Sequence, residues 1–217
     1  IAGIEEADAL LIVGSNPRRE APLVNARIRK AWLAGGLQVA AIGTPVDLTY
    51  PVEWLGERPL ALGGLLGGAG FAEVLKAAKR PMIIVGQAAL ARPDGAALLA
   101  ACWKLAAETG MLTADWHGFN VLHTAASRVG ALDLGFLPGQ GGKDLAGMLG
   151  GGVDVLWLLG ADEFDTAKIG AETFVVYQGH HGDAGAARAD VILPGAAYTE
   201  KNGTYVNTEG RVQLGRQ

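Results

Sequence analysis

Short apolar runs that end at Gly or Pro are the feature of this sequence that most restricts its fold. Six such runs occur, at residues 9–13, 39–42, 82–85, 153–159, 173–177 and 191–193. Each run is continuously apolar rather than alternating, which is typical of strands buried on both faces of a parallel sheet. We therefore predict an α/β fold with mainly parallel sheets and helices on both faces.

The segments between these runs contain helical patterns. In residues 21–36, Val24, Ile28 and Trp32 fall on one apolar stripe, and a pair of glycines follows the last turn. Residues 93–110 contain a second stripe, which also ends at a glycine. Both segments are predicted to be helices that cover the sheet.

Two stretches lack a sustained period, at residues 45–70 and 115–152. We interpret the first as a linker or long connection, with a lobe boundary near its glycine-rich end, and the second as functional loop or short helix. The predicted organisation is a first α/β lobe at 1–68, which is incomplete, and a second lobe at 72–217 that ends in a polar ribbon.

Composition excludes several classes of function. The chain has 217 residues and a net charge of −4 with no block of basic residues, so nucleic acid is not an expected partner. No apolar run approaches the roughly 20 residues that span a bilayer, so no direct membrane span is expected. Nothing at the start resembles a signal peptide, and because the sequence begins without Met, we interpret it as a fragment of a longer protein.

Cys102 is the sole cysteine of the sequence. It excludes an internal disulfide, and this chain by itself cannot hold an iron–sulfur cluster or a four-cysteine zinc site. Because Cys102 lies on an apolar helical stripe, we expect a buried small hydrophobic side chain and not a nucleophile.

Two strands end in the same way. Residues 7–17 and 153–163 each contain an Asp, an apolar strand, a glycine, a small residue and then Asn or Asp. The glycines are Gly14 and Gly160. This similarity indicates duplicated architecture, although chance would also account for a single match.

Ligands of open α/β sheets bind beyond the carboxyl ends of the strands. This rule selects residues 14–16, 43–44, 160–162 and 178–181 as the candidate rim. Arg18 is suited to meet a phosphate, and together with Arg19 and Glu20 it is also suited to position loops or contact partner subunits. The alternative is that these residues are ordinary strand-to-helix corners.

Familiar catalytic and metal motifs are missing. No G-x-G-x-x-G follows the first strand, and residues 139–144 lack the first glycine and the Ser or Thr of a phosphate loop. His180 and His181 are adjacent, so within a strand they would point in opposite directions and could not both bind one metal. No metal site and no catalytic residue is predicted.

Three phrases carry a family resemblance: GIEEADALLIVGSNPRREAPLVNARIRKAW, IGTPVDLTY, and YQGHHGDAGAARADVILPGAAYTEKNGTYVNTEGRVQ. They resemble the family of the large iron–sulfur subunit of NADH:quinone oxidoreductase, respiratory complex I. That family belongs to the wider molybdopterin oxidoreductase family, which includes formate dehydrogenases. The resemblance implies a molybdopterin oxidoreductase-like fold of the formate dehydrogenase domain type in two lobes.

The resemblance also implies a site. In active members, loops of this kind contact the guanine-dinucleotide halves of the cofactor, and the ribbon runs along the cleft with bends at Asn202-Gly203 and Glu209-Gly210. The implied residues of this relic cleft are Gly14, Ser15, Asn16, Arg18, Gly160, Asp162, Gln178, His181 and Asn202.

The function implied is that of a non-catalytic scaffold region supporting electron transfer from NADH to quinone. No cofactor is expected in these residues, and the parent subunit is expected to carry 2Fe–2S and 4Fe–4S clusters through residues outside them. Other subunits of the complex I peripheral arm are the expected partners. The expected location is the cytoplasmic face of the bacterial inner membrane, or the matrix side in mitochondria.

Two alternatives stay open. One is part of a catalytic molybdenum or tungsten bis-guanine-dinucleotide oxidoreductase, such as a formate dehydrogenase. The other is the nucleotide-binding middle domain of a thiamine-diphosphate enzyme, which would explain the strands but not the ribbon after residue 193.

Overall fold

A computed structural model describes residues 2–126 and 128–217 of the chain. The fold divides into two compact units, one ending at Ala125 and the other beginning at Ala126. The predicted lobe boundary at 68–72 therefore differs from the observed division and falls inside the first unit. The glycines at that point connect two helices that pack on the same sheet.

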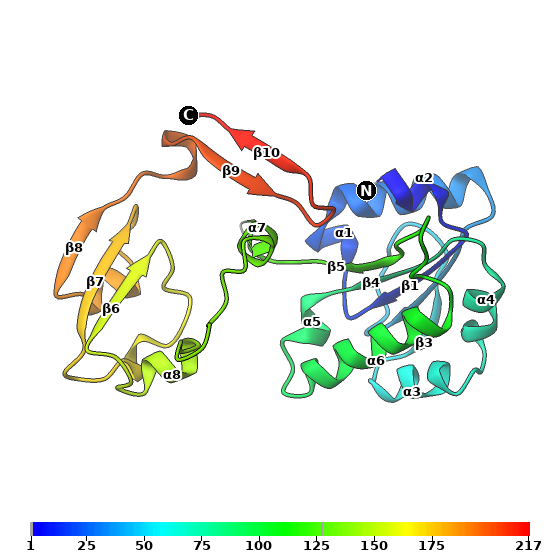
Figure 1. Ribbon diagram of the computed structural model, residues 1–217. Coiled ribbons are helices and arrows are strands. Elements are labelled where there is room, and N and C mark those ends of the chain that lie inside the picture. The colour runs from blue at the N-terminus through cyan, green and yellow to red at the C-terminus, as the bar shows by residue number, and fades with distance from the viewer. Residues whose placement is uncertain (1, 127) are drawn as a thin grey trace. The chain divides into compact units, whose positions relative to one another are not determined.

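The first unit is built on a parallel five-stranded sheet in the order β3-β2-β1-β4-β5 (Figure 1). The strands are β1 (Ala9–Val13), β2 (Gln38–Ile42), β3 (Glu53–Gly56), β4 (Pro81–Val85) and β5 (Phe119–Val121). Every residue of β1 and β4 is buried, as continuous apolar runs predict. Strand order reverses between β1 and β4, which is where ligands bind in doubly wound folds.

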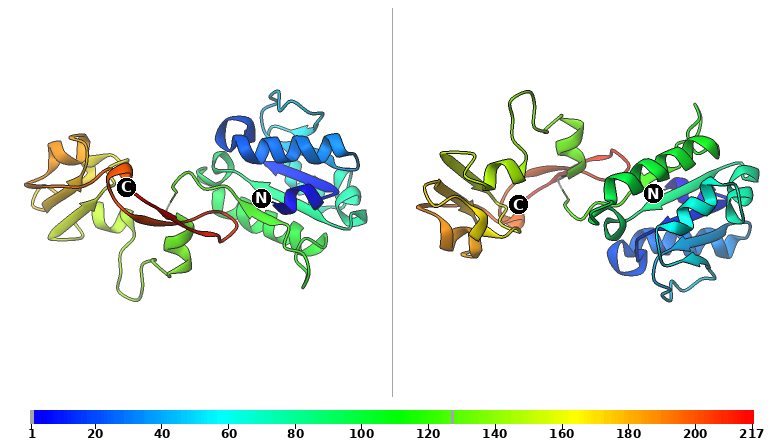
Figure 2. Two further views of the ribbon diagram at one scale, coloured as in Figure 1. Left: turned by 90° about the horizontal axis from the view of Figure 1, so that it is seen from above. Right: turned by 90° about the horizontal axis from the view of Figure 1, so that it is seen from below.

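Both faces of this sheet are covered. The helical elements are η1 (Ala2–Glu6), α1 (Pro17–Glu20), α2 (Pro22–Ala34), α3 (Leu60–Leu66), α4 (Phe71–Ala77), α5 (Gln87–Leu90) and α6 (Gly95–Glu108). One core cluster joins Leu11 of β1 to residues of α3, α4 and α6, and the other joins Leu10 of β1 to Ile28 of α2. Figure 2 shows α2 and α6 on opposite faces of the sheet.

The second unit contains a parallel three-stranded sheet in the order β6-β7-β8. Its strands are β6 (Val155–Leu159), β7 (Phe174–Gly179) and β8 (Val191–Pro194), and its helical elements are α7 (Arg128–Asp133), α8 (Leu145–Leu149), η2 (Thr166–Lys168), α9 (Ala184–Arg188) and η3 (Tyr198–Glu200). The ribbon forms an antiparallel hairpin of β9 (Gly203–Val206) and β10 (Val212–Gly215).

The predicted α/β class and the six predicted strands are confirmed, but burial on both faces is confirmed only for the first sheet. β6 alternates between exposed and buried residues. The covered face carries Leu156 and Leu158, which pack with Leu149 of α8. The other face leaves Trp157 56% and Leu159 71% exposed.

Sequence periodicity missed several short elements. The stretch 45–70 contains β3 and α3, and the stretch 115–152 contains β5, α7 and α8. None of these elements exceeds seven residues, too short to develop a clear period. In the ribbon, Gly210 bends the hairpin at φ +77°, while Gly203 is the first residue of β9 and not a turn glycine.

The prediction for Cys102 can be compared directly with the structure. Cys102 is fully buried, and burial raises the pKa of its thiol to about 11, so the predicted hydrophobic role is confirmed. Within the described residues, no single helix is both long and apolar enough to cross a membrane, while α3 and α4 meet that test only as a bent pair.

Candidate functional site

The loop after β1 is the best-defined corner at the carboxyl edge of the first sheet. Gly14 has φ +58°, and its N–H donates to the carbonyl of Ile42 at 2.9 Å. A Cβ at Gly14 would lie 2.6 Å from the Cβ of Ala89, and one at Gly86 would lie 2.3 Å from the carbonyl oxygen of Gly14. Only glycine at both positions allows the loops after β1 and β4 to pack this closely.

The Glu20 carboxylate is bonded to this loop. Ser15 Oγ donates to Glu20 Oε2 at 3.0 Å, and the backbone N–H of Asn16 donates to Glu20 Oε1 at 2.6 Å. In the other direction, the Glu20 N–H donates to the carbonyl of Asn16 at 2.9 Å. These reciprocal bonds close the single turn of α1 and engage two polar hydrogens of the predicted cofactor loop.

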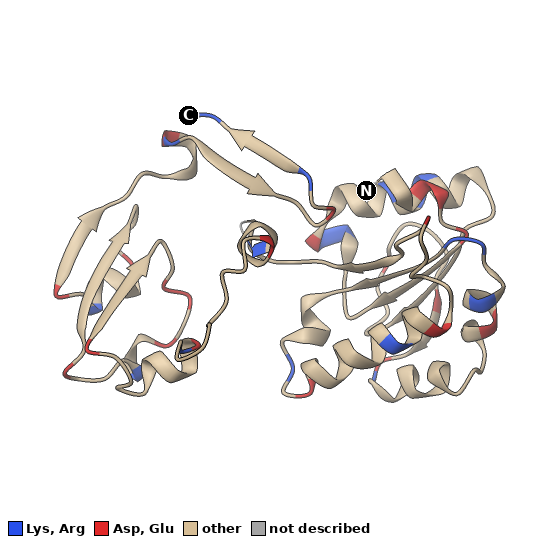
Figure 3. Ribbon diagram, viewed as in Figure 1, with Lys and Arg blue, Asp and Glu red and all other residues tan. Residues whose placement is uncertain are grey.

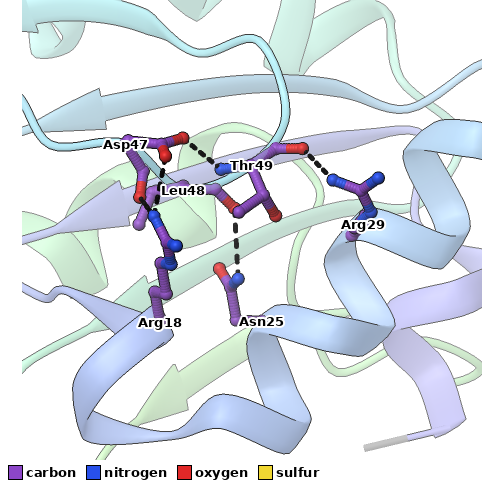
Figure 4. A network of polar contacts seen from close by, with 6 residues as sticks. All are labelled: Arg18, Asn25, Arg29, Asp47, Leu48 and Thr49. Carbon is purple, nitrogen blue, oxygen red and sulfur yellow. Dashed lines mark hydrogen bonds and ion pairs between the residues drawn. The ribbon is translucent and has the colours of Figure 1, made fainter.

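Arg18 is likewise engaged by an acidic partner. Its Nη1 donates to Asp47 Oδ2 at 2.7 Å and to the carbonyl of Asp47 at 3.0 Å (Figure 4). Hydrogen bonding from the Thr49 N–H, followed by that from Arg18, lowers the pKa of Asp47. Thr49 has φ +73°, an uncommon value for a β-branched residue, so the contacts around it hold the loop in a strained conformation.

A buried asparagine anchors the same loop. Asn25 is 6% exposed, its Nδ2 donates to the carbonyl of Leu48 at 3.1 Å, and its Oδ1 accepts from the Tyr50 hydroxyl at 2.8 Å. Figure 4 shows Asn25 of α2 pointing at this loop between Arg18 and Arg29. Burial raises the pKa of Tyr50, so its hydroxyl keeps its proton and serves as a donor.

A cavity of about 340 Å³ lies at this edge of the sheet. Its apolar wall includes Ile42 and Leu62, and its polar lining includes Asn16, Glu20 and Glu57. Arg92 also lines it, but that guanidinium donates to both carboxylate oxygens of Asp94 at 2.7 and 3.0 Å and thereby lowers the pKa of Asp94. The cavity is therefore apolar, with an acidic rim and with its arginine already paired.

The second unit repeats the first corner. Gly160 has φ +62°, and its N–H donates to the carbonyl of Gln178 on the neighbouring strand at 2.7 Å. Two residues later, Asp162 Oδ2 accepts from the N–H of Gly185 in the first turn of α9 at 2.8 Å. The local geometry at Gly14 and Gly160 therefore matches, as their similar sequences predict.

The remaining predicted residues serve local structure. The carbonyl of His181 accepts from the Tyr177 hydroxyl at 2.9 Å, and Asn202 Oδ1 accepts from the Gln217 N–H at 3.3 Å. β7 ends at Gly179, so His180 and His181 lie outside the strand, and their rings meet edge to face at 4.4 Å between centroids. The argument that the two rings would point in opposite directions applied to a strand and does not apply here. Groups of three or more residues able to bind a metal are absent from the described part of the chain.

The structure thus groups Gly14, Ser15, Asn16 and Arg18 in the first unit, and Gly160, Asp162, Gln178 and His181 in the second. Sequence reasoning did not anticipate Asn25 or Asp47. Asn25 lies three residues before Ile28 and so falls on the buried stripe of its helix. A polar residue in that register is a signal of a buried hydrogen bond.

The parallel sheets, with strands that end at glycines and short polar loops at their carboxyl ends, define the chain as an α/β protein of the doubly wound class. A model of the molybdopterin oxidoreductase family matches residues 1–217, and the chain belongs to that family.

Among curated relatives, the chain is similar to the NADH-ubiquinone oxidoreductase 78 kDa subunit, mitochondrial, of Neurospora crassa, with 49% identity over all of this chain and 28% of the relative. It is also similar to a subunit of the NADH-quinone oxidoreductase of Rickettsia bellii, with 46% identity over 99% of this chain and 30% of the relative. The chain therefore spans less than a third of the length of these relatives.

The fold is shared with a solved structure of the formyltransferase/hydrolase complex (FhcABCD) from Methylorubrum extorquens in complex with methylofuran. The TM-score is 0.65 at 19% sequence identity, and the match covers 99% of this chain and 70% of that one. At this identity the likeness concerns the fold alone.

The family implies a molybdopterin cofactor, and its diphosphate needs hydrogen-bond donors and positive charge. The first rim does not fit that group. Ser15 Oγ and the Asn16 N–H both donate to Glu20, while Asn16 Oδ1 is buried without a hydrogen-bond partner and is an acceptor itself. A phosphate at these two donors would have to displace the Glu20 carboxylate.

Proposed function

We propose that this chain is a non-catalytic, molybdopterin oxidoreductase-like scaffold region of the large iron–sulfur subunit of NADH:quinone oxidoreductase. The observation that carries the proposal is the 46–49% identity, along 99–100% of this chain, to relatives that are named as subunits of this oxidoreductase. In this role it braces the part of the subunit through which electrons pass from NADH to quinone.

The rim of the first unit supports a scaffold role and not a catalytic one. Two donors of the loop after β1, the Ser15 hydroxyl and the Asn16 N–H, are bonded to Glu20. Arg18 and Arg92 are each paired with an aspartate. Groups that would bind a dinucleotide are thus used to hold loops in place. The parent subunit would carry its 2Fe–2S and 4Fe–4S clusters on residues outside this chain.

The exposed apolar face of the second sheet supports the proposal that this unit is part of a larger protein. Its strands carry no charged residue (Figure 3), and one face exposes Val155, Trp157 and Phe174. A parallel sheet is ordinarily covered on both faces. The proposed cover is further sequence of the same subunit, since the relatives are more than three times as long as the matched region.

The proposed partners are the other subunits of the peripheral arm. The proposed location follows from that assembly: the cytoplasmic face of the bacterial inner membrane, or the matrix side in mitochondria. Neither the proposed contacts with partner subunits nor the proposed location requires a membrane-spanning segment in this chain.

The test is metal and pterin analysis of the assembled complex that contains this chain. We expect the complex to contain stoichiometric iron and to oxidise NADH with quinone, and we expect molybdenum, tungsten and pterin only at trace level. One molybdenum or tungsten and a pterin per chain would overturn the scaffold proposal and favour the catalytic alternative, as would isolation of the chain in a formate-oxidising enzyme.

A further inference from the structure

Two donors of the β1 loop, residues 14–16, converge on one carboxylate. Gly14 turns the chain with φ +58°, and the Ser15 hydroxyl and Asn16 N–H then point at a single acceptor, the Glu20 carboxylate. Two hydrogens converging on two oxygens of one anion is the arrangement that a phosphate would use. We propose that Glu20 is an internal anion that occupies this site and excludes phosphate groups from it.

The bond lengths and the chain connectivity favour the internal occupant. The Asn16 N–H lies 2.6 Å from one carboxylate oxygen of Glu20 and the Ser15 hydroxyl 3.0 Å from the other, so both donors have a hydrogen-bond acceptor in the same side chain. Glu20 is four residues from Asn16 on the turn that these bonds close, so it meets the donors without the entropic cost of bringing in a separate molecule. A free phosphate must displace the Glu20 carboxylate from the donors, and the negative charge of Glu20 would then remain close to the negative charge of the phosphate.

A second carboxylate in the cavity lining also opposes a phosphate. Glu57 lines the same cavity, and Asp47 and Asp94 pair with Arg18 and Arg92. Exposed ion pairs of this kind are individually weak, so the two arginines could exchange partners. The Glu20 contact to the loop itself is therefore the decisive element.

In the second unit, a side-chain carboxylate also accepts a hydrogen bond from a backbone N–H. Asp162, two residues after Gly160, accepts from the Gly185 N–H at the start of α9. A side-chain carboxylate again bonds a backbone donor near a strand end. Asp162 belongs to a separate unit, so its contact is an independent instance and not part of the first site.

This inference deepens the proposed function and rests on it for the role of the closed rim. The test titrates the full chain with inorganic pyrophosphate, by calorimetry and by following the Asn16 amide resonance. Wild type and Glu57→Gln are expected to show no saturable binding and no shift of the Asn16 resonance. Glu20→Gln keeps the side-chain size and removes the charge. It is expected to bind pyrophosphate saturably, with an affinity at least about tenfold above the detection limit set by wild type, or ~1.4 kcal/mol.

Adding Ser15→Ala to Glu20→Gln is expected to reduce the gained affinity, which locates binding at the loop. Saturable pyrophosphate binding to wild type with a shifted Asn16 resonance would overturn the inference, whatever the variants do. A folded Glu20→Gln that gains no affinity would overturn it too, and Glu20→Ala supplies the same measurement if the glutamine variant does not fold.

The two failures are distinguishable. Molybdenum and pterin in the assembled complex would defeat the scaffold function even if Glu20 excluded pyrophosphate. Pyrophosphate bound at Asn16 in a complex that lacks pterin would overturn only the proposal that Glu20 excludes phosphate groups, and the scaffold function would remain.

Discussion

The two sheets of this chain are built from similar strands but have different surroundings. In the first unit, helices cover both faces, and every residue of β1 and β4 is buried. In the second unit, β6 is as apolar as β1, yet alternate residues are exposed. A continuously apolar strand therefore predicts burial on both faces. It does not identify which part of the protein covers each face.

The largest expected difference between the sheets is the cost of truncating a strand leucine. Leu11→Ala in β1, where Leu11 is fully buried, should lower the free energy of unfolding by about 3 kcal/mol, because it removes buried apolar atoms and leaves a cavity. Leu159→Ala in β6, where the side chain is 71% exposed, should change it by less than about 0.5 kcal/mol. Amide hydrogen exchange would report on each unit separately, and equal costs would contradict the comparison.

Buried polar anchors provide the next contrast. Asn25→Ala should cost about 2 kcal/mol, because it leaves both the Leu48 carbonyl and the Tyr50 hydroxyl without their partner. Thr173→Ala in the second unit removes one hydrogen bond, to the carbonyl of Val153, and should cost about 1 kcal/mol. Urea unfolding of the two variants would measure this, and an Asn25 variant as stable as wild type would contradict the anchoring role.

The exposed apolar face of β6 should be detectable by dye binding and self-association, in a variant whose stability is nearly unchanged. Trp157→Thr keeps a good strand residue and should alter the free energy of unfolding by less than about 0.5 kcal/mol. It should lower the fluorescence of a bound apolar dye and reduce self-association in sedimentation experiments, because the apolar patch becomes smaller.

Leu60→Thr is the matched control, since Leu60 is 84% exposed but lies in the first unit. If it lowered dye binding as strongly as Trp157→Thr, the second sheet would not be the distinctive surface.

The smallest expected effect concerns acid sensitivity of the first unit. The Thr49 N–H, followed by Arg18, lowers the pKa of Asp47 below its ordinary value of 3.8. Asp47 therefore contributes stability above that pH, and the contribution is lost as the pH falls through the lower folded-state pKa. Asp47→Asn should lower the thermal midpoint slightly at pH 6 and not at pH 2. An equal effect at both pH values would contradict this origin.

Several parts of the candidate site were predictable because they depend on neighbours in sequence. Gly14 and Gly160 end apolar strands, and each adopts a positive φ that glycine reaches without strain. Glu20 lies one helical turn from Asn16, so its contact to the loop is also local. The partnership of Asn25 with Leu48 and Tyr50 spans more than 20 residues, and the sequence supplied only the hint of a polar residue on a buried stripe.

The amino-acid sequence by itself determined the α/β class, the six principal strands and the buried state of Cys102, since these follow from local apolarity and glycine placement. Only the tertiary structure decided the division at Ala125, the one-sided cover of β6 and the pairing of Arg18 with Asp47. These features depend on which distant segments meet in space, and the local pattern of residues does not encode that contact.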